Sequence, residues 1–103
     1  ALAEALEDGP VFVNFTAAWC ITCKVNEAGV LNTASVRQAM IDKGVTYLKA
    51  DWTSEDSNIT AALAEYGRGG VPLYLLYGRG MARAEVLPQM LTKGIVIDAL
   101  DRL

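Results

Sequence analysis

The sequence contains no histidine and only two cysteines, Cys20 and Cys23, among 103 residues. A zinc or iron–sulfur site with four ligands therefore cannot form within one chain unless carboxylates supplement the cysteines. Small secreted domains that depend on disulfides for folding typically carry about four cysteines or more. The cysteine count thus argues against a bound metal, and by itself it leaves the redox compartment undetermined.

Clusters of basic residues and long apolar runs are also missing. Nine Lys and Arg residues against twelve Asp and Glu residues give a net charge of −3, and no two basic residues are adjacent. Nucleic acids and anionic membranes attract basic patches, so we expect neither as a partner. No apolar run approaches the roughly 20 residues that span a bilayer. The acidic segment 1–8 predicts an amphipathic helix rather than a signal peptide, and the lack of an initial Met favours a processed chain or an excised fragment.

The residues that are present have the composition of a packed globular domain. Hydrophobic residues make up 52% of the chain and charged residues 20%, unlike a disordered chain, which is poorer in apolar residues. The sequence shows neither internal repeats nor low-complexity segments. Its length predicts a single domain over residues 1–103.

Hydrophobic periodicity and turn residues predict alternating helices and strands. Strands are expected over residues 11–15, 45–50 and 73–77, with a weaker antiparallel strand over 81–87 after a tight turn at 78–80. Helices are expected over residues 1–8 and from Cys20 to a fading end near Gly29. A third helix should run from a cap at Asn32 or Thr33 to Lys43–Gly44, and a fourth over 59–66 up to a left-handed cap at Gly67. The last should begin at Thr92, with Val96, Ala99, Leu100 and Leu103 on one side. Two strands joined by a helical crossover pair in parallel, so helices should cover both faces of the sheet.

Three tyrosines lie within these predicted elements, and one tryptophan follows a predicted strand. Tyr66, Tyr74 and Tyr77 are expected to pack in the core and against the sheet rather than to line a ligand site. Trp52, at the end of a predicted strand, has no assigned role.

The segment Trp19-Cys20-Ile21-Thr22-Cys23-Lys24 carries the clearest chemical signal. A helix that begins at Cys20 places the first sulfur beside unpaired backbone N–H groups, which favour a thiolate over a thiol. Such a position lowers a cysteine pKa from about 8.5 toward neutrality or below. Cys23 lies one helical turn further on, close enough for a disulfide but less open to solvent. We therefore expect Cys20 to be the nucleophile and Cys23 the resolving thiol.

An inert disulfide and a pair of buried thiols are the structural alternatives for this pair, and metal binding is a further one. A bridge that closes so short a loop removes little chain entropy, so it stabilises a fold poorly. The two cysteines also lack the additional ligands that a metal site needs. The residues themselves thus favour a redox role.

The order of the elements, the Trp-Cys-x-x-Cys segment and the downstream Val71–Pro72 together resemble the thioredoxin-like superfamily. Within it, residues 14–24 and 69–73 look most like the C-terminal domain of DsbD-type thiol:disulfide interchange proteins, including the ScsB-like branch. The resemblance covers nearly the whole chain. It implies an α/β thioredoxin-like fold with a central mixed sheet of about four strands and helices on both faces.

What the resemblance implies for function is an electron relay. In that family the domain is a periplasmic part of an inner-membrane protein, whose membrane-embedded domain donates electrons that this domain passes to a periplasmic acceptor domain. The resemblance thus implies a protein-disulfide reductase whose partners are protein thiols and disulfides. It implies no cofactor besides the redox-active Cys20–Cys23 disulfide, and we expect a monomer without membrane insertion of this fragment.

The resemblance also assigns residues around the cysteines. The Val71–Pro72 peptide bond is expected to be cis, which places the Val71 backbone beside the sulfurs, where an extended partner segment can pair with it. Trp19 is expected to shield the site and to offer a contact surface, with core packing as its alternative. Ile21 and Thr22 are expected to be exposed, to tune the cysteine pKa and to contact the partner.

Two further positions concern the proton of the resolving thiol. Asn14 stands six residues before the first cysteine, where thioredoxin-like proteins often carry a buried acid, and an amide cannot take that proton. DsbD-type domains carry a Glu seven residues after the first cysteine, and Glu27 holds that place. Because Glu27 follows Cys23 by one helical turn, we expect it to raise the pKa of Cys23 or to accept its proton. The structural alternative is a solvated surface glutamate.

Two other functions stay open on the sequence. A disulfide oxidase or isomerase uses the same chemistry and differs in its reduction potential, which the Ile21–Thr22 dipeptide does not determine. A redox-silent binding module of the same fold would bind a partner chain without using Cys20. The reduction potential separates the first alternative from a reductase, and a Cys20→Ser variant separates the second.

Overall fold

The computed structural model describes residue 7, residues 9–78 and residues 84–103. The helix expected over residues 1–8 and the turn expected at residues 78–80 fall largely outside this range. In chain order the described elements are β1 (Val11–Thr16), α2 (Ile21–Asn26), the π-helical η1 (Glu27–Leu31), α3 (Ala34–Asp42), β2 (Thr46–Asp51), α4 (Ser57–Glu65), β3 (Leu73–Tyr77), β4 (Glu85–Leu87) and α5 (Lys93–Asp101).

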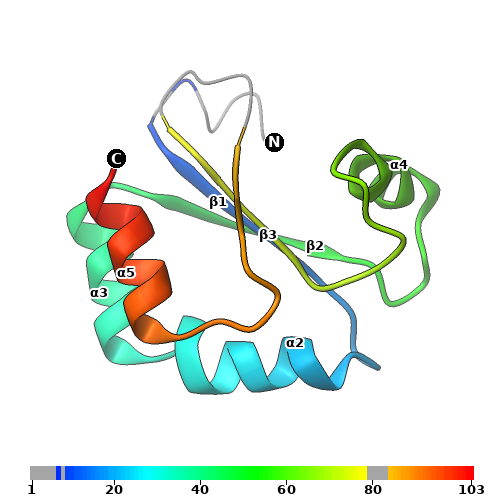
Figure 1. Ribbon diagram of the computed structural model, residues 1–103, viewed down its shortest axis with the longest axis horizontal. Helices are drawn as coiled ribbons and strands as arrows, with labels where there is room; N and C mark the ends of the chain where they lie inside the picture. Colours follow the sequence, from blue (N-terminus) through cyan, green and yellow to red (C-terminus); the bar gives the residue numbers. More distant parts are fainter. Residues whose placement is uncertain (1–6, 8, 79–83) are drawn as a thin grey trace.

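The strands of the described residues form one mixed sheet in the order β2-β1-β3-β4. β1 pairs in parallel with β2, and β3 pairs antiparallel with both β1 and β4. Figure 1 shows α4 on one side of the sheet and α2, α3 and α5 on the other. This confirms the expected α/β fold with a four-stranded mixed sheet and helices on both faces. It also places β1, the strand that leads into the cysteine segment, inside the sheet.

The alternation of side chains along β1 decides which of them reach the cysteine helix. All six residues of the strand are buried. Its odd-numbered residues pack in the core beneath α4, whereas Phe12 packs with core residues of α3 and α5 on the opposite face. Successive side chains of a strand point to opposite faces, so Asn14 and Thr16 share the face of Phe12. Two polar side chains therefore lie between the sheet and the helix that carries the cysteines.

The sequence predicted that the helix after Cys20 would end near Gly29, but the helix continues past this residue. α2 continues directly into η1, where the Asn32 N–H donates to the Glu27 carbonyl at 2.7 Å, and Thr33 then becomes the N-cap of α3. A glycine inside a helix costs only about 1 kcal/mol, and burial of Val30 and Leu31 next to it offsets that cost. The predicted split of the crossover is confirmed, but it lies at Asn32.

Several other boundaries differ from the prediction. β2 begins and ends one residue later than expected, and β4 begins only at Glu85 within the described residues. Leu103 was expected to face inward, but α5 ends at Asp101 and Leu103 is 45% exposed, because it lies beyond the helix face that packs on the sheet. The predicted caps are confirmed: Gly67 has a φ of 70°, and the Thr92 hydroxyl accepts the Ile95 N–H at 3.1 Å.

Tyr66, Tyr74 and Tyr77 pack in the core and against the sheet as expected, and Trp52 packs in the core as well. Tyr74 and Tyr77 are buried, and the Tyr77 hydroxyl lies 3.2 Å from that of half-buried Tyr66. Trp52 is 7% exposed in the core beneath α4, and its Nε1 donates to the Thr60 hydroxyl at 2.8 Å. Trp52 therefore fastens the end of β2 to α4.

Candidate active site

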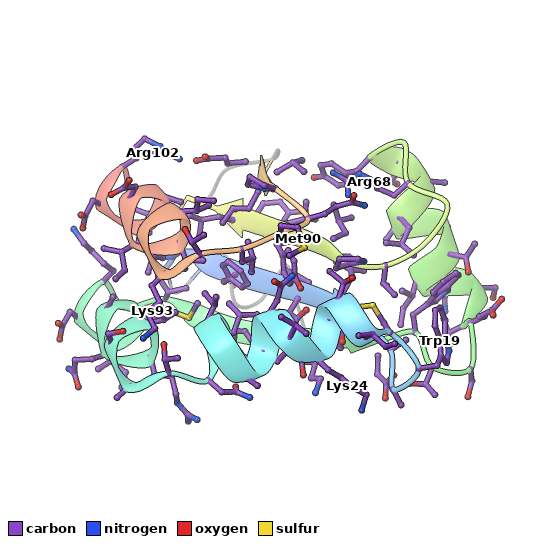
Figure 2. The ribbon with its side chains drawn as sticks, turned by 60° about the horizontal axis from the view of Figure 1, so that its bottom comes forward. Trp19, Lys24, Arg68, Met90, Lys93 and Arg102 are labelled. Atoms are coloured by element: carbon purple, nitrogen blue, oxygen red, sulfur yellow. A yellow bond between two sulfur atoms is a disulfide. The ribbon has the colours of Figure 1, made fainter. Side chains whose placement is uncertain are left out.

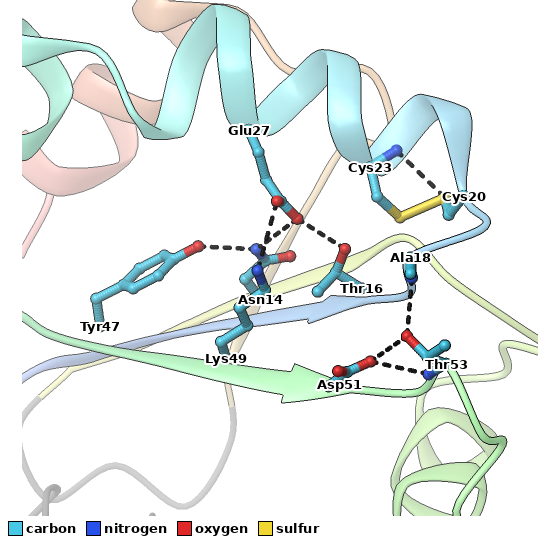
Figure 3. A network of polar contacts seen from close by, with 10 residues as sticks. All are labelled: Asn14, Thr16, Ala18, Cys20, Cys23, Glu27, Tyr47, Lys49, Asp51 and Thr53. Atoms are coloured by element: carbon cyan, nitrogen blue, oxygen red, sulfur yellow. Dashed lines mark hydrogen bonds and ion pairs between the residues drawn. A yellow bond between two sulfur atoms is a disulfide. The ribbon is translucent and has the colours of Figure 1, made fainter.

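Cys20 and Cys23 form a disulfide at the N-terminal end of α2, with their Cα atoms 5.3 Å apart (Figure 3). Cys20 is the N-cap of α2, and its sulfur accepts the Cys23 backbone N–H at 3.2 Å. Cys20 is 8% exposed, whereas Cys23 is completely buried. Cys20, which the sequence predicts as the nucleophile, is thus the more exposed of the two cysteines, and its sulfur lies next to an N–H that stabilises a thiolate after reduction.

Val71 and Pro72 form a second wall of the site. Their peptide bond is cis, as expected. Val71 packs against the buried cluster of Ala17, Cys20 and Cys23, and Pro72 is itself buried. The Arg68 guanidinium donates to the Pro72 carbonyl at 3.4 Å. The structure therefore brings this segment to the disulfide, from a loop about fifty residues away in sequence.

The side chain of Trp19, the residue before Cys20, is exposed and is held in place by Trp52 and Thr53. Its side chain is 53% exposed, and its Nε1 donates to the Thr53 carbonyl at 3.1 Å. Its ring lies 5.7 Å from that of Trp52, centroid to centroid. Figure 2 shows Trp19 at the end of the molecule where α2 begins. Core packing is thus the role of Trp52, and Trp19 presents an apolar surface beside Cys20.

The two residues between the cysteines differ in exposure. Ile21 is 78% exposed, as predicted. Thr22 is half-buried, so the prediction that it is exposed is wrong. Successive helical residues point about 100° apart, and Thr22 therefore borders the buried face on which Cys23 lies. Ile21 is the apolar side chain of this dipeptide that a partner can contact directly.

Glu27 faces the polar side chains of β1 rather than open solvent (Figure 3). Its Oε2 accepts hydrogen bonds from the Thr16 hydroxyl at 2.7 Å and from Asn14 Nδ2 at 3.3 Å. Its Oε1 lies 3.6 Å from Lys49 Nζ on β2, and its side chain is 17% exposed. The alternative of a freely solvated surface glutamate is therefore wrong for Glu27.

The surroundings of Glu27 keep its carboxyl group ionised. Burial raises the pKa of Glu27, whereas the hydrogen bonds from Thr16 and Asn14 and the positive charge of Lys49 lower it. The lowering contributions outweigh burial, so the pKa of Glu27 lies below its usual value. At neutral pH the group is a carboxylate with the capacity to accept a proton.

Asn14 is the fully buried centre of this network. Its Nδ2 donates both to Glu27 and to the Tyr47 hydroxyl, the latter at 2.8 Å. Among the described residues nothing bonds to its Oδ1, which is buried. An ionised acid at this position would place a second negative charge next to Glu27 and repel its carboxylate, whereas the Asn14 amide donates a hydrogen bond to that carboxylate. Glu27 is therefore the acid of this network.

A polar cavity connects the network with solvent. It has a volume of about 190 Å³ and lies on the β2 side of the cysteine helix. Polar residues that line it include Thr16, Lys24, Glu27, Lys49, Asp51 and Thr53. A proton taken up by Glu27 can therefore leave to bulk water through this cavity.

Comparison with known proteins identifies the fold and its relatives. The sequence pattern described as thioredoxin-like matches residues 1–78. The chain belongs to the thioredoxin-like family. The thiol:disulfide interchange protein DsbD of Neisseria meningitidis serogroup A / serotype 4A is 35% identical to it over 80 residues, which are 78% of this chain and 13% of that protein. The chain thus spans only a small part of this curated relative.

Solved structures locate that part. The crystal structure of the Neisseria meningitidis DsbD C-terminal domain in the oxidised form has a TM-score of 0.79 and 29% identity, covering 98% of this chain and 91% of that one. The reduced form has a TM-score of 0.77 and 30% identity, covering 98% and 92%. This thioredoxin-like domain is therefore homologous to the DsbD C-terminal domain, and it carries the disulfide on which thiol–disulfide exchange depends. Within its described residues no helix combines the length and apolar character that a membrane crossing requires.

Asn26 supports the site of this thioredoxin-like domain, and no sequence pattern pointed to it. Its side chain is 1% exposed. Its Nδ2 donates to the Tyr74 hydroxyl at 2.8 Å and to the Gln89 carbonyl at 2.7 Å, while its Oδ1 accepts the Leu91 N–H at 3.2 Å. Asn26 thereby fixes the inner face of α2 to β3 and to the segment that precedes α5. A polar residue inside a helix carries no periodic signal of such contacts, so pattern analysis overlooks it.

Proposed function

We propose that this domain reduces disulfides of periplasmic protein partners and receives its electrons from a membrane-embedded domain of the same inner-membrane protein. The observation that carries the proposal is the position of Cys20, which is the more exposed cysteine of the disulfide, caps α2 and packs with Val71. The homology to the DsbD C-terminal domain supports the donor, the acceptor and the periplasmic location.

The reaction begins with the reduced domain. The Cys20 thiolate attacks one sulfur of the partner disulfide, which releases the other partner sulfur as a thiolate and leaves a mixed disulfide on Cys20. Cys23 then attacks the Cys20 sulfur, so that the Cys20–Cys23 bond forms and the partner leaves reduced. Two electrons pass from the domain to the partner, and a dithiol donor restores the starting state.

Glu27 accepts the proton that Cys23 must lose before it attacks. Cys23 and Glu27 occupy consecutive turns of one helix, and the Glu27 N–H donates to the Cys23 carbonyl. The carboxylate is ionised at neutral pH and opens onto the polar cavity. Asn14 contributes a hydrogen bond to the carboxylate in place of a second acid. Glu27 therefore takes the acid–base role in this domain.

The partner binds across the walls of the site. Because Cys20 is only 8% exposed, a sulfur that bonds to it brings its own chain against the neighbouring surface. That surface comprises the ring of Trp19, the side chains of Ile21 and Thr22, and the Val71–Pro72 segment. Exposed apolar area on Trp19 and Ile21 favours partners with apolar residues next to their reactive cysteine.

Reduction of a protein disulfide tests this proposal. In the presence of dithiothreitol the domain should accelerate the reduction and precipitation of insulin, and Cys20→Ser should abolish the acceleration because the attacking thiolate is lost. Ala28→Ser, on the exposed side of the same helical segment, serves as the matched control and should retain full activity. A parent domain that gives no acceleration over dithiothreitol alone would instead indicate a redox-silent binding module.

A further inference from the structure

The Thr16 hydroxyl lies beside Glu27 but has no role in the exchange reaction proposed above. Thr16 ends β1, is 4% exposed and points to the cysteine side of the sheet. Among the described residues, the only hydrogen bond of its side chain is the 2.7 Å donation from the hydroxyl to Glu27 Oε2. A hydroxyl has one hydrogen to donate and two lone pairs that accept. The lone pairs of Thr16 are thus available to a second donor.

The residue next to Thr16 along the chain lies against the disulfide. Ala17, the next residue, packs directly against Cys20 and Cys23. Figure 3 shows the Thr16 hydroxyl on the side of the Glu27 carboxylate that faces the disulfide. In the reduced protein Cys23 carries a buried S–H, a weak donor that can bond to a nearby hydroxyl oxygen. Asn14 cannot take a proton, and the Glu27 oxygens are engaged by Thr16, Asn14 and Lys49.

We propose that the Thr16 hydroxyl relays the proton of Cys23 to Glu27 during the resolving step. The Cys23 S–H transfers its proton to Thr16 Oγ1 while the hydroxyl proton of Thr16 moves to Glu27 Oε2. The resulting Cys23 thiolate attacks the Cys20 sulfur, the Cys20–Cys23 bond forms, and the bond from Cys20 to the partner breaks with the partner leaving as a thiolate. Glu27 then loses its proton to water in the cavity. This relay rests on the proposed exchange function.

An aromatic disulfide separates the two steps and therefore tests the relay. Each half of dithiobis(nitrobenzoate) absorbs visible light once it is released as a thiolate. In a stopped-flow mixing experiment with the reduced domain, release of the first half reports attack by Cys20, and release of the second half reports resolution by Cys23. Thr16→Val keeps the branched shape in the strand and removes the hydroxyl. We expect a parental first phase and a second phase slowed by about tenfold or more.

The pH dependence distinguishes a relay from an indirect effect on Glu27. Loss of the Thr16 hydrogen bond also raises the pKa of Glu27, and a defect of that origin disappears at higher pH, where Glu27 is ionised again. The relay predicts that the second phase of Thr16→Val stays slow at neutral pH, where Glu27 is ionised and the Cys23 thiol is still protonated, and that it recovers only at high pH, where solvent removes the thiol proton directly. A second phase that has the parental rate already at neutral pH overturns the relay and leaves Thr16 as a positioning residue.

Further variants complete the test. Thr16→Ser retains a hydroxyl and should restore a fast second phase, whereas Glu27→Gln should slow it as Thr16→Val does. Because both groups act in series, the double variant should be no slower than the slower single variant, and multiplied defects would contradict the relay. Thr46→Val, an exposed strand residue, is the matched control and should behave like the parent. Thr16→Ala gives the same comparison if valine perturbs folding.

The same stopped-flow absorbance measurements distinguish failure of the relay from failure of the exchange function. If the parent releases neither half of the reagent, Cys20 is not a nucleophile and the proposed function is wrong. If the parent releases both halves and Thr16→Val matches it in both phases, the exchange function stands and the relay alone is refuted.

Discussion

Replacing Cys23 with serine is expected to abolish turnover while the first step of the reaction continues. Serine lacks the sulfur that forms the second disulfide, so a partner captured by Cys20 cannot be released. The backbone N–H of the substituted residue still reaches the Cys20 sulfur, because that hydrogen bond uses no side-chain atom of position 23. The variant should therefore accumulate a mixed disulfide with a protein or small-molecule disulfide.

Non-reducing electrophoresis and intact-mass measurement follow this adduct. Cys23→Ser should show a stable increase in mass equal to one partner half, which dithiothreitol removes. Cys20→Ser, which keeps the buried cysteine, is the paired control and should form no adduct because Cys23 is completely buried. An adduct on Cys20→Ser equal to that on Cys23→Ser would reverse the assigned roles of nucleophile and resolving thiol.

Replacing Asn26 with leucine is expected to produce the largest loss of stability among substitutions outside the apolar core. The change removes three hydrogen bonds and leaves the Tyr74 hydroxyl, the Gln89 carbonyl and the Leu91 N–H without their partner. A buried polar group left unpaired costs about 1–3 kcal/mol. The free energy of unfolding should fall by roughly 2–5 kcal/mol in total, a large part of the about 5–15 kcal/mol typical of a domain.

Urea unfolding of the oxidised protein, followed by circular dichroism, measures this loss. Asn58→Leu makes the same substitution at an exposed position of α4 and should change the free energy by no more than about 0.5 kcal/mol. A loss for Asn26→Leu as small as that of the control would mean that the three hydrogen bonds do not hold α2 to the rest of the domain.

The chemistry of the cysteine segment was predictable because it depends on local features. A thiol at the first position of a helix and a second thiol one turn later follow from the sequence Trp19–Lys24, and the structure has Cys20 as the N-cap. The meeting of Val71 with the disulfide followed from the resemblance to a known fold, since no local pattern joins residues so far apart. The strands of the four-stranded sheet were also predictable from the sequence, because they are short runs of apolar residues bounded by turn residues.

The polar network beneath the cysteine helix was only partly predictable. The position of Glu27 was expected, but its partners Thr16 and Lys49 come from two different strands whose register the sequence does not specify. The roles of Thr16 and Asn26 had no signal at all, because single polar residues inside apolar segments fit many arrangements. The continuation of the helix through Gly29 depended on burial of its neighbours, which appears only in the packed structure.

The pKa of Cys20 in the reduced domain tests the account most directly, because the exchange reaction begins with its thiolate. The rate of alkylation by iodoacetamide as a function of pH gives this value, and Cys23→Ser isolates Cys20 as the reacting thiol. The N-cap position predicts a midpoint well below the roughly 8.5 of a free cysteine, and urea-unfolded protein should return to that value. A folded-state midpoint at or above about 8.5 would contradict the claim that the start of α2 activates Cys20 for thiol–disulfide exchange.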